Sequence, residues 1–290
     1  MSFLVLSLCL CVMFVKFPIN TTSVVPQDYR EVPILMYHRL TSKKRTRRKY
    51  VVTANLFAED LKYIKNNGYT TVVIQDLIDY VKNKKDLPDK PIVLMFDDGF
   101  YNNYLYGFPL LKEHNCKMVI SPIVKEVDYY SFYVSDSHAE YAYCTWSQLK
   151  EMHDSQLVEV QNHSYDMHET GKRYGIMKKR GESFEKYKQR LTKDFQTAQE
   201  KIEREIGVAP TAFIYPFGAV NKESMNILKG LGCEVFANCE ERINKIKRGD
   251  PECLYSLKRF FRSYKKSSED YFKIKIEGKR KQKLNLFGEN

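Results

Sequence analysis

A chain of 290 residues, 43% of them hydrophobic, can bury one substantial core, and no internal repeat or low-complexity stretch divides it. Its formal net charge of +11 could suit a nucleic-acid partner, but no zinc-finger spacing, RNP-like motif or basic heptad helix accompanies the charge, so we expect no nucleic acid. The expected partner is an anionic cell surface or membrane. The seven cysteines contain no CxxC pair, so they do not predict a zinc ribbon.

The N-terminus carries an apolar run over residues 3–15, followed by Lys16 and a polar stretch that contains proline. This length suits the core of a signal peptide and is short of the roughly 20 residues that span a bilayer, although Phe17 and Ile19 could extend the run. Residues 1–30 are therefore expected to be a signal peptide or membrane anchor with a linker, and a buried N-terminal helix is the alternative. The expected location is extracellular or at the cell surface, by secretion or by this anchor.

Short apolar runs alternate with amphipathic segments over residues 31–265, and these two patterns are typical of buried strands and of helices. The predicted strands cover residues 32–37, 70–74, 91–96, 118–124, 158–161, 212–215 and 234–237. The predicted helices cover residues 56–67, 75–82, 104–115, 145–154, 182–206 and 222–231. Gly68 and Gly207 follow two of these helices as stop signals.

Strand–helix alternation repeated this often predicts a parallel sheet, and the number of repeats favours a barrel over an open sheet. We therefore predict an α/β fold, a distorted (β/α) barrel of about seven parallel strands. It would form a single catalytic domain over residues 31–265 of a monomeric protein. Residues 266–290 are expected to be a basic C-terminal tail, and the basic run over residues 43–49 a solvated loop.

Four of the predicted strands end in a polar or conformationally unusual residue. These ends are His38, Asp97-Asp98-Gly99, His163, and the Tyr-Pro-Phe-Gly sequence at residues 215–218. In parallel α/β folds, functional residues collect at the carboxyl ends of the strands. One such end would mean little, but four in one chain predict a pocket.

The adjacent carboxylates Asp97 and Asp98 should raise one another's pKa unless a cation or a cationic side chain lies between them. A divalent metal bound by one of them and a water molecule held by the other would resolve this repulsion, and an Asx turn is the alternative. His163 and His168 are five positions apart, which in a helix would place them roughly 140° apart, so we expect them on a loop. With Asp98 they would make a two-histidine, one-carboxylate site typical of catalytic metals. Surface histidines are the alternative, and Asp166 is a competing oxygen ligand.

These residues resemble the motifs of carbohydrate esterase family 4, the polysaccharide deacetylases with a NodB-type domain. MFDDGF is similar to the family motif T-F-D-D-G, NHSYDMH to H-[ST]-x-x-H with one extra residue, and IYPFG to R-x-P-[YF]-G. The resemblance covers roughly residues 31–262. The extra residue, and the lack of any histidine after His168, resemble the branch of poly-β-1,6-N-acetylglucosamine deacetylases.

The resemblance implies hydrolytic removal of N-acetyl groups from N-acetylglucosamine units of a cell-surface or cell-wall polysaccharide, with β-1,6 or β-1,4 linkage left open. It implies that Asp98, His163 and His168 hold a divalent metal, zinc in the first place, with nickel or cobalt as alternatives. Tyr215 and Phe217 are candidates for a sugar-stacking face, and aromatic core packing is the alternative. An O-acetyl esterase and a catalytically inactive glycan-binding domain are the alternative functions.

The resemblance also implies the catalytic roles. Asp97 would remove a proton from water as general base, and the backbone N–H of Phe217 would stabilise the oxyanion. The late histidine that usually serves the family as general acid is missing, and His38 matches the early strand end that supplies the acid in the similar branch. Ile214 stands where the family usually has an arginine that orients the base. Arg259 is the candidate for that role, because arginine pairs bidentately with a carboxylate; a surface arginine is the alternative.

Overall fold

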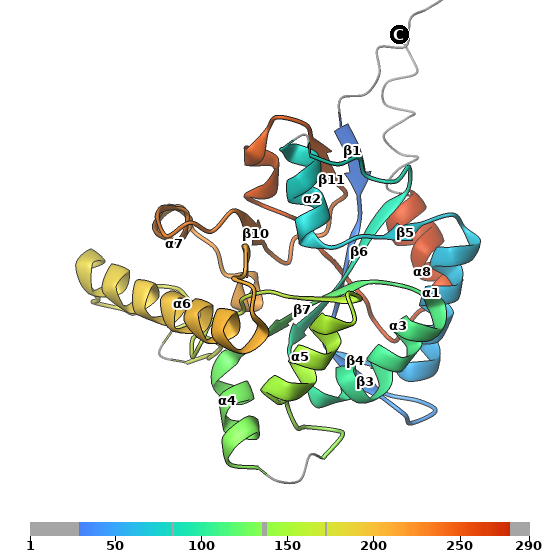
Figure 1. Cartoon of the computed structure of the whole chain (residues 1–290), viewed down its shortest axis with the longest axis horizontal. Coiled ribbons are helices and arrows are strands. Elements are labelled where there is room, and N and C mark those ends of the chain that lie inside the picture. The colour runs from blue at the N-terminus through green and yellow to red at the C-terminus, as the bar shows by residue number, and fades with distance from the viewer. Residues whose placement is uncertain (1–28, 83, 135–137, 172, 279–290) are drawn as a thin grey trace, which may run out of the picture.

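The computed structural model describes residues 29–82, 84–134, 138–171 and 173–278 (Figure 1). The predicted signal peptide or anchor therefore lies almost wholly outside the described residues, as do residues 279–290 of the predicted tail. Among the helices of these ranges, none is both long and apolar enough to cross a membrane.

A parallel sheet forms the centre of the molecule, in the order β12–β2–β6–β7–β8, with β5 paired to β6. Its strands are β2 (Ile34–Tyr37), β5 (Thr70–Thr71), β6 (Pro91–Asp98), β7 (Met118–Pro122), β8 (Val158–Val160) and β12 (Phe260–Phe261). A second parallel pair consists of β9 (Ala212–Ile214) and β10 (Val235–Ala237). Isolated parallel bridges, Asn162 to Phe213 and Ala237 to Leu257, link this pair to residues next to β8 and β12. The continuous ladder does not close within the described residues, so the predicted α/β barrel is a distorted one.

Helices cover the outside of the strands (Figure 1). They are α1 (Ala54–Asn66), α2 (Ile74–Val81), α3 (Phe108–His114), α4 (Val124–Phe132), α5 (Trp146–Asp154), α6 (Phe184–Ile206), α7 (Lys222–Gly230) and α8 (Ser268–Tyr271). Short π-helices, η1 (Asn103–Gly107) and η4 (Phe272–Glu277), and short 3₁₀-helices, η2 (Pro216–Gly218) and η3 (Pro251–Leu254), accompany them. The hydroxyl groups of Thr53, Thr145 and Ser183 cap the first turns of α1, α5 and α6. Gly207 ends α6 with a φ of 91°, as its position predicts.

Two predicted strands are shorter than expected, because helices begin earlier than the apolar runs indicate. Asp76 accepts a hydrogen bond from the backbone N–H of Val73 at 3.1 Å, which starts α2 within the predicted strand over residues 70–74. The strand predicted over residues 118–124 ends at Pro122, and α4 follows from Val124. Five short strands were not predicted. They are β12 in the central sheet, the pair β1 (Tyr29–Val32) and β11 (Asn244–Lys247), and the pair β3 (Arg39–Thr41) and β4 (Val51–Thr53).

The predicted C-terminal tail begins too early in the sequence. Residues 268–277 form α8 and η4, and Tyr271, Phe272 and Ile276 are buried in the main hydrophobic cluster. The ring of Phe272 stacks on that of Tyr63 in α1, with centroids 4.5 Å apart. Lysines alternate with apolar residues in this segment, so its apolar face is not evident from the sequence. Burial of that face attaches the segment to the domain.

Side-chain alternation along β6 decides which way each of its residues faces. Leu94 and Phe96 pack under the helices, in the cluster that also contains residues of α1, α3 and α5. Met95 lies in a second hydrophobic cluster, which also contains residues of β9 and β10. Asp97 follows Met95 by two residues and therefore faces the interior between the strands.

Candidate active site

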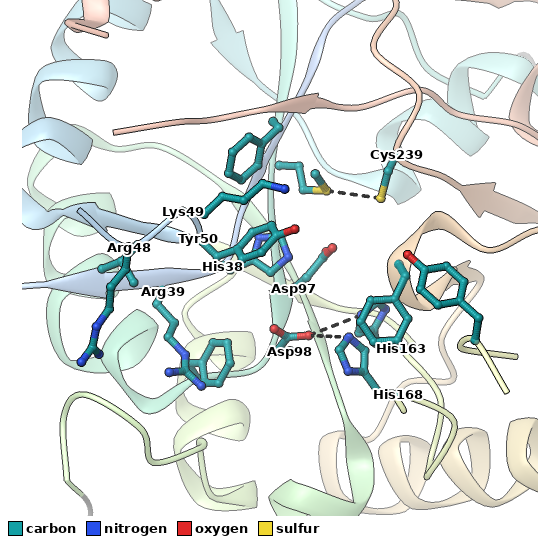
Figure 2. Close-up of a pocket in the computed structure, with 16 residues that line it drawn as sticks. His38, Arg39, Arg48, Lys49, Tyr50, Asp97, Asp98, His163, His168 and Cys239 are labelled. Atoms are coloured by element: carbon teal, nitrogen blue, oxygen red, sulfur yellow. Dashed lines mark hydrogen bonds and ion pairs between the residues drawn. The ribbon is translucent and has the colours of Figure 1, made fainter. Parts of the chain in front are cut away.

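A cavity of about 570 Å³ lies at the carboxyl ends of the parallel strands (Figure 2). His38 follows β2, Asp97 and Asp98 end β6, His163 follows β8, and Phe217 follows β9; all five line this cavity. The four strand ends that the sequence singles out therefore meet in one place.

A tight turn after β6 presents Asp98. This residue has a φ of 72°, in the left-handed region that aspartate tolerates better than most residues. Gly99 has a φ of 79°, and a Cβ at this position would lie 2.6 Å from the Cβ of Pro122 on the neighbouring strand β7. No side chain fits there, so the Asp-Asp-Gly sequence has a steric cause. The turn directs Asp98 toward His163 and His168 (Figure 2).

His163 and His168 lie on the loop between β8 and α6, as their spacing predicts. The Nε2 atoms of His163 and His168 are 3.5 Å and 3.2 Å from Oδ1 of Asp98. Nδ1 of His163 lies 2.7 Å from the carbonyl oxygen of Ile214. Because only a protonated Nδ1 can donate to that oxygen, Nε2 keeps the lone pair that a metal ligand needs.

These three groups fit a metal ion by their geometry and chemistry. One ligand atom from each lies within 4.8 Å of the others. Oδ1 of Asp98 is buried and makes no hydrogen bond within the described part of the chain, which is costly for a carboxylate without a cation. Burial lowers the pKa of His168 to about 4, so this ring is neutral and able to ligate at neutral pH. The competing ligand Asp166 instead pairs with Lys125, its Oδ2 lying 2.8 Å from Nζ.

Burial alone would raise the pKa of Asp98. The closeness of His163, His38 and His168 outweighs burial and holds this pKa well below the usual range. Asp98 is therefore ionised, as a metal ligand has to be.

Asp97 is paired with Arg259, which is fully buried, so the surface alternative for this arginine is wrong. Nη1 of Arg259 lies 2.7 Å and 2.8 Å from the two carboxylate oxygens of Asp97, and its Nε donates to the carbonyl oxygen of Asn238 at 2.8 Å. The expected contact is present, although one nitrogen supplies both hydrogen bonds. Burial would raise the pKa of Asp97, but the charge of Arg259 leads the effects that lower it below its ordinary value. Asp97 can therefore accept a proton, while its role as base stays a prediction.

His38 lies beside both carboxylates, with its ring 4.8 Å from that of Tyr50 and 6.4 Å from that of Phe261 (Figure 2). Burial lowers the pKa of His38, and the charges of Asp97 and Asp98 oppose this effect in part. Its Nδ1 is buried without a hydrogen-bond partner among the described residues. The position allows proton transfer to a group in the cavity, and the role of general acid stays a prediction.

Phe217 has a φ of 58°, unusual for a bulky residue. Its ring centroid lies 4.3 Å from that of His168 and 5.0 Å from that of Tyr174, so these rings form an aromatic wall. Tyr215 is only 1% exposed and packs near Phe236, which excludes it as a sugar-stacking residue. The oxyanion role of the Phe217 backbone N–H stays a prediction.

Asp194 on α6 supports the loop that carries His163 and His168, a role that is not predicted from the sequence. Its Oδ1 and Oδ2 accept hydrogen bonds from the backbone N–H groups of Tyr165 and Asp166, at 3.0 Å and 2.8 Å. Both donors lie between the two histidines. Burial raises the pKa of Asp194 to about 6, so it is mostly ionised at neutral pH. Within a helix rich in Lys and Glu no local signal marks this residue, because its partners are distant in sequence.

We expect Asp194→Asn to weaken binding of a divalent metal ion by roughly 10- to 100-fold while the fold is retained, because an amide can accept only one of the two hydrogen bonds. Competition with a chromogenic chelator would measure the affinity, and circular dichroism the fold. Asp154→Asn, at the exposed end of α5, removes the same charge and should change neither. Equal affinity in the two variants would show that Asp194 does not position the loop.

The chain is similar in sequence to known proteins over a range that includes Asp98, His163 and His168. A family model described as polysaccharide deacetylase matches residues 84–236. A poly-β-1,6-N-acetyl-D-glucosamine N-deacetylase of Escherichia coli O157:H7 is 26% identical over 242 residues, which is 74% of this chain and 35% of that protein. One of the same name from Staphylococcus aureus strain MRSA252 is 25% identical over 202 residues, 67% of this chain and 62% of that protein. The chain thus spans less than two thirds of the length of these relatives.

A solved structure of a de-N-acetylase from Aggregatibacter actinomycetemcomitans is also similar. It matches with a TM-score of 0.71 and 27% sequence identity, over 83% of this chain and 99% of that one. The agreement extends over nearly all of that chain, so it supports the barrel architecture described above.

Proposed function

Because the chain belongs to the polysaccharide deacetylase family, we propose that its cavity hydrolyses the N-acetyl groups of N-acetylglucosamine units in a polysaccharide and releases acetate. The observation that carries this proposal is the joint presence, in one cavity, of a metal-ligating triad and an ionised carboxylate beside it. The names of the bacterial relatives support the choice of substrate and favour β-1,6 linkage.

A divalent ion at Asp98, His163 and His168, which we propose to be zinc, would polarise the acetyl carbonyl and lower the pKa of a water molecule there. The chain's own residues would move the protons. Asp97, kept ionised by Arg259, would take a proton from the attacking water.

Two further groups would complete the reaction. The backbone N–H of Phe217 would donate a hydrogen bond to the oxyanion of the tetrahedral intermediate. His38 would give a proton to the sugar amine as the C–N bond breaks. The wall formed by Phe217 and Tyr174 offers flat apolar surface against which a sugar ring can pack.

Purified protein supplied with zinc should release acetate from β-1,6-linked N-acetylglucosamine oligomers, and more slowly from β-1,4-linked oligomers of the same length. Acetate can be measured with a coupled enzyme assay. Asp97→Asn should lower the rate of acetate release by roughly 10²–10⁴, because the side-chain amide of asparagine cannot act as a general base.

The comparison with O-acetylated sugars separates the alternatives. Faster release from O-acetylated than from N-acetylated oligomers would identify an O-acetyl esterase. Binding of oligomers without any release of acetate would identify an inactive glycan-binding domain.

A further inference from the structure

A second cavity, of about 280 Å³, lies beside the catalytic cavity, and the two share Arg39, Arg48 and Val51. The loop over residues 42–50, which joins β3 to β4, forms much of its wall. From the sequence, this basic run is predicted only to be a solvated loop. Its side chains are indeed exposed, but they stand at the edge of the active site, as the positions of Arg39, Arg48 and Lys49 show (Figure 2).

The wall of the second cavity carries a large excess of positive charge. Its basic side chains are Arg39, Lys43, Arg45, Arg47 and Arg48. Among the described residues, Glu140 is the one carboxylate that lines it. Glu140 contacts Lys43 and lies 3.8 Å from Arg48. Five basic groups against one carboxylate leave most of the charge free to bind an anion.

Arg39 is held in place at the junction of the two cavities. Its guanidinium lies 3.9 Å above the ring of Phe100, which lines the catalytic cavity, and its Nη1 is 3.4 Å from the carbonyl oxygen of Glu140. A fixed guanidinium loses little freedom when it binds an oxyanion, and arginine forks match carboxylate and phosphate geometry. This end of the basic wall is therefore preorganised.

The wall that the two cavities share indicates which anionic partner the basic side chains suit. When one sugar of a polysaccharide lies in the catalytic cavity, its neighbouring sugars leave through the mouth of that cavity. Arg39 and Arg48 line both cavities and lie at this mouth. A flat membrane bound to the same side chains would lie across the mouth and exclude the polymer. The basic wall therefore suits an anionic group on the polymer better than a lipid surface.

We infer that the loop over residues 42–50 binds a carboxylate or phosphate-diester group of the polysaccharide next to the N-acetylated sugar, so the preferred substrate is an acidic polysaccharide. This inference rests on the proposed function and specifies its substrate class. The affinity should fall with salt, because the charges are exposed and their attraction is screened.

The test compares oligomers of equal length that contain N-acetylglucosamine and are neutral, carry glucuronate, or carry phosphate diesters. At about 0.1 M salt we expect kcat/KM to be roughly 10-fold higher for one or both acidic sets, mainly through a lower KM, and the advantage to vanish at about 1 M salt. The two acidic arms show whether carboxylate or phosphate is preferred. Arg45→Gln with Arg47→Gln should remove most of the advantage.

A matched control removes two positive charges elsewhere. Lys186→Gln with Lys188→Gln, on the exposed side of α6, should keep the preference, because neither residue lines either cavity. Equal kcat/KM for neutral and acidic oligomers in the unmodified protein, or equal loss in both double variants, would overturn the inference. Binding to phosphatidylserine vesicles without any preference among oligomers would overturn it in favour of membrane attachment.

A binding measurement separates this inference from the proposed function. An oligoglucuronate without acetyl groups should bind the full-length protein in calorimetry, with Kd roughly 10-fold higher after Arg45→Gln and Arg47→Gln. If that binding is found while no oligomer releases acetate, the anion site stands and the deacetylase proposal fails. If acetate is released but oligoglucuronate does not bind, the anion site is refuted and the deacetylase proposal stands.

Discussion

Replacing His163 and His168 together by alanine should abolish metal binding and reduce acetate release to the background of the assay. Only Asp98 would remain of the three proposed ligands, and a single carboxylate does not hold a zinc or similar ion against competing water and buffer. Metal content by mass spectrometry after gel filtration should fall from about one ion per chain to nearly none. This is the largest effect that we expect of any substitution in the protein.

The control for this experiment removes two imidazoles that lie outside the cavity, His138 and His153. His138→Ala with His153→Ala should keep full metal content and activity. Circular dichroism would show whether each variant folds, since His163 also bonds to the carbonyl oxygen of Ile214. A folded variant that lacks His163 and His168 but keeps its metal would contradict the assignment of these ligands.

His38→Ala should collapse turnover of N-acetylated sugars by roughly 10²–10⁴ while metal content stays unchanged. The sugar amine is a poor leaving group and needs a proton as it departs, and His38 is the candidate donor beside Asp97 and Asp98. An activated aryl acetate expels a stable phenolate, which hardly needs that proton. We therefore expect the variant to keep much of its activity on the aryl acetate.

The comparison of the two substrates is what identifies a proton donor. His38→Gln serves as a second variant, because it keeps a polar side chain between Tyr50 and Phe261 but cannot act as an acid near neutral pH. If both activities fell equally in both variants, His38 would be a packing or positioning residue. If neither fell, the proton would have to come from another group.

The predictions that succeeded from sequence depend on short-range information. Apolar periodicity located most strands and helices, and hydroxyl caps or glycine stops located several helix ends, because these signals act within a few residues. The strand ends could be read as a pocket because parallel strands share one functional edge. The loop position of His163 and His168 followed from their spacing alone.

The tertiary structure decided which distant residues meet, and this cannot be read from spacing. Arg259 reaches Asp97 because β12 lies beside β2, and Asp194 reaches the histidine loop because α6 packs across it. Tyr215 faces the core while Phe217 faces the cavity, which depends on the turn between them. The basic loop borders the active site only because β3 and β4 pair there. Each of these contacts depends on how separate elements pack, whereas sequence periodicity reports only which face of one element is buried.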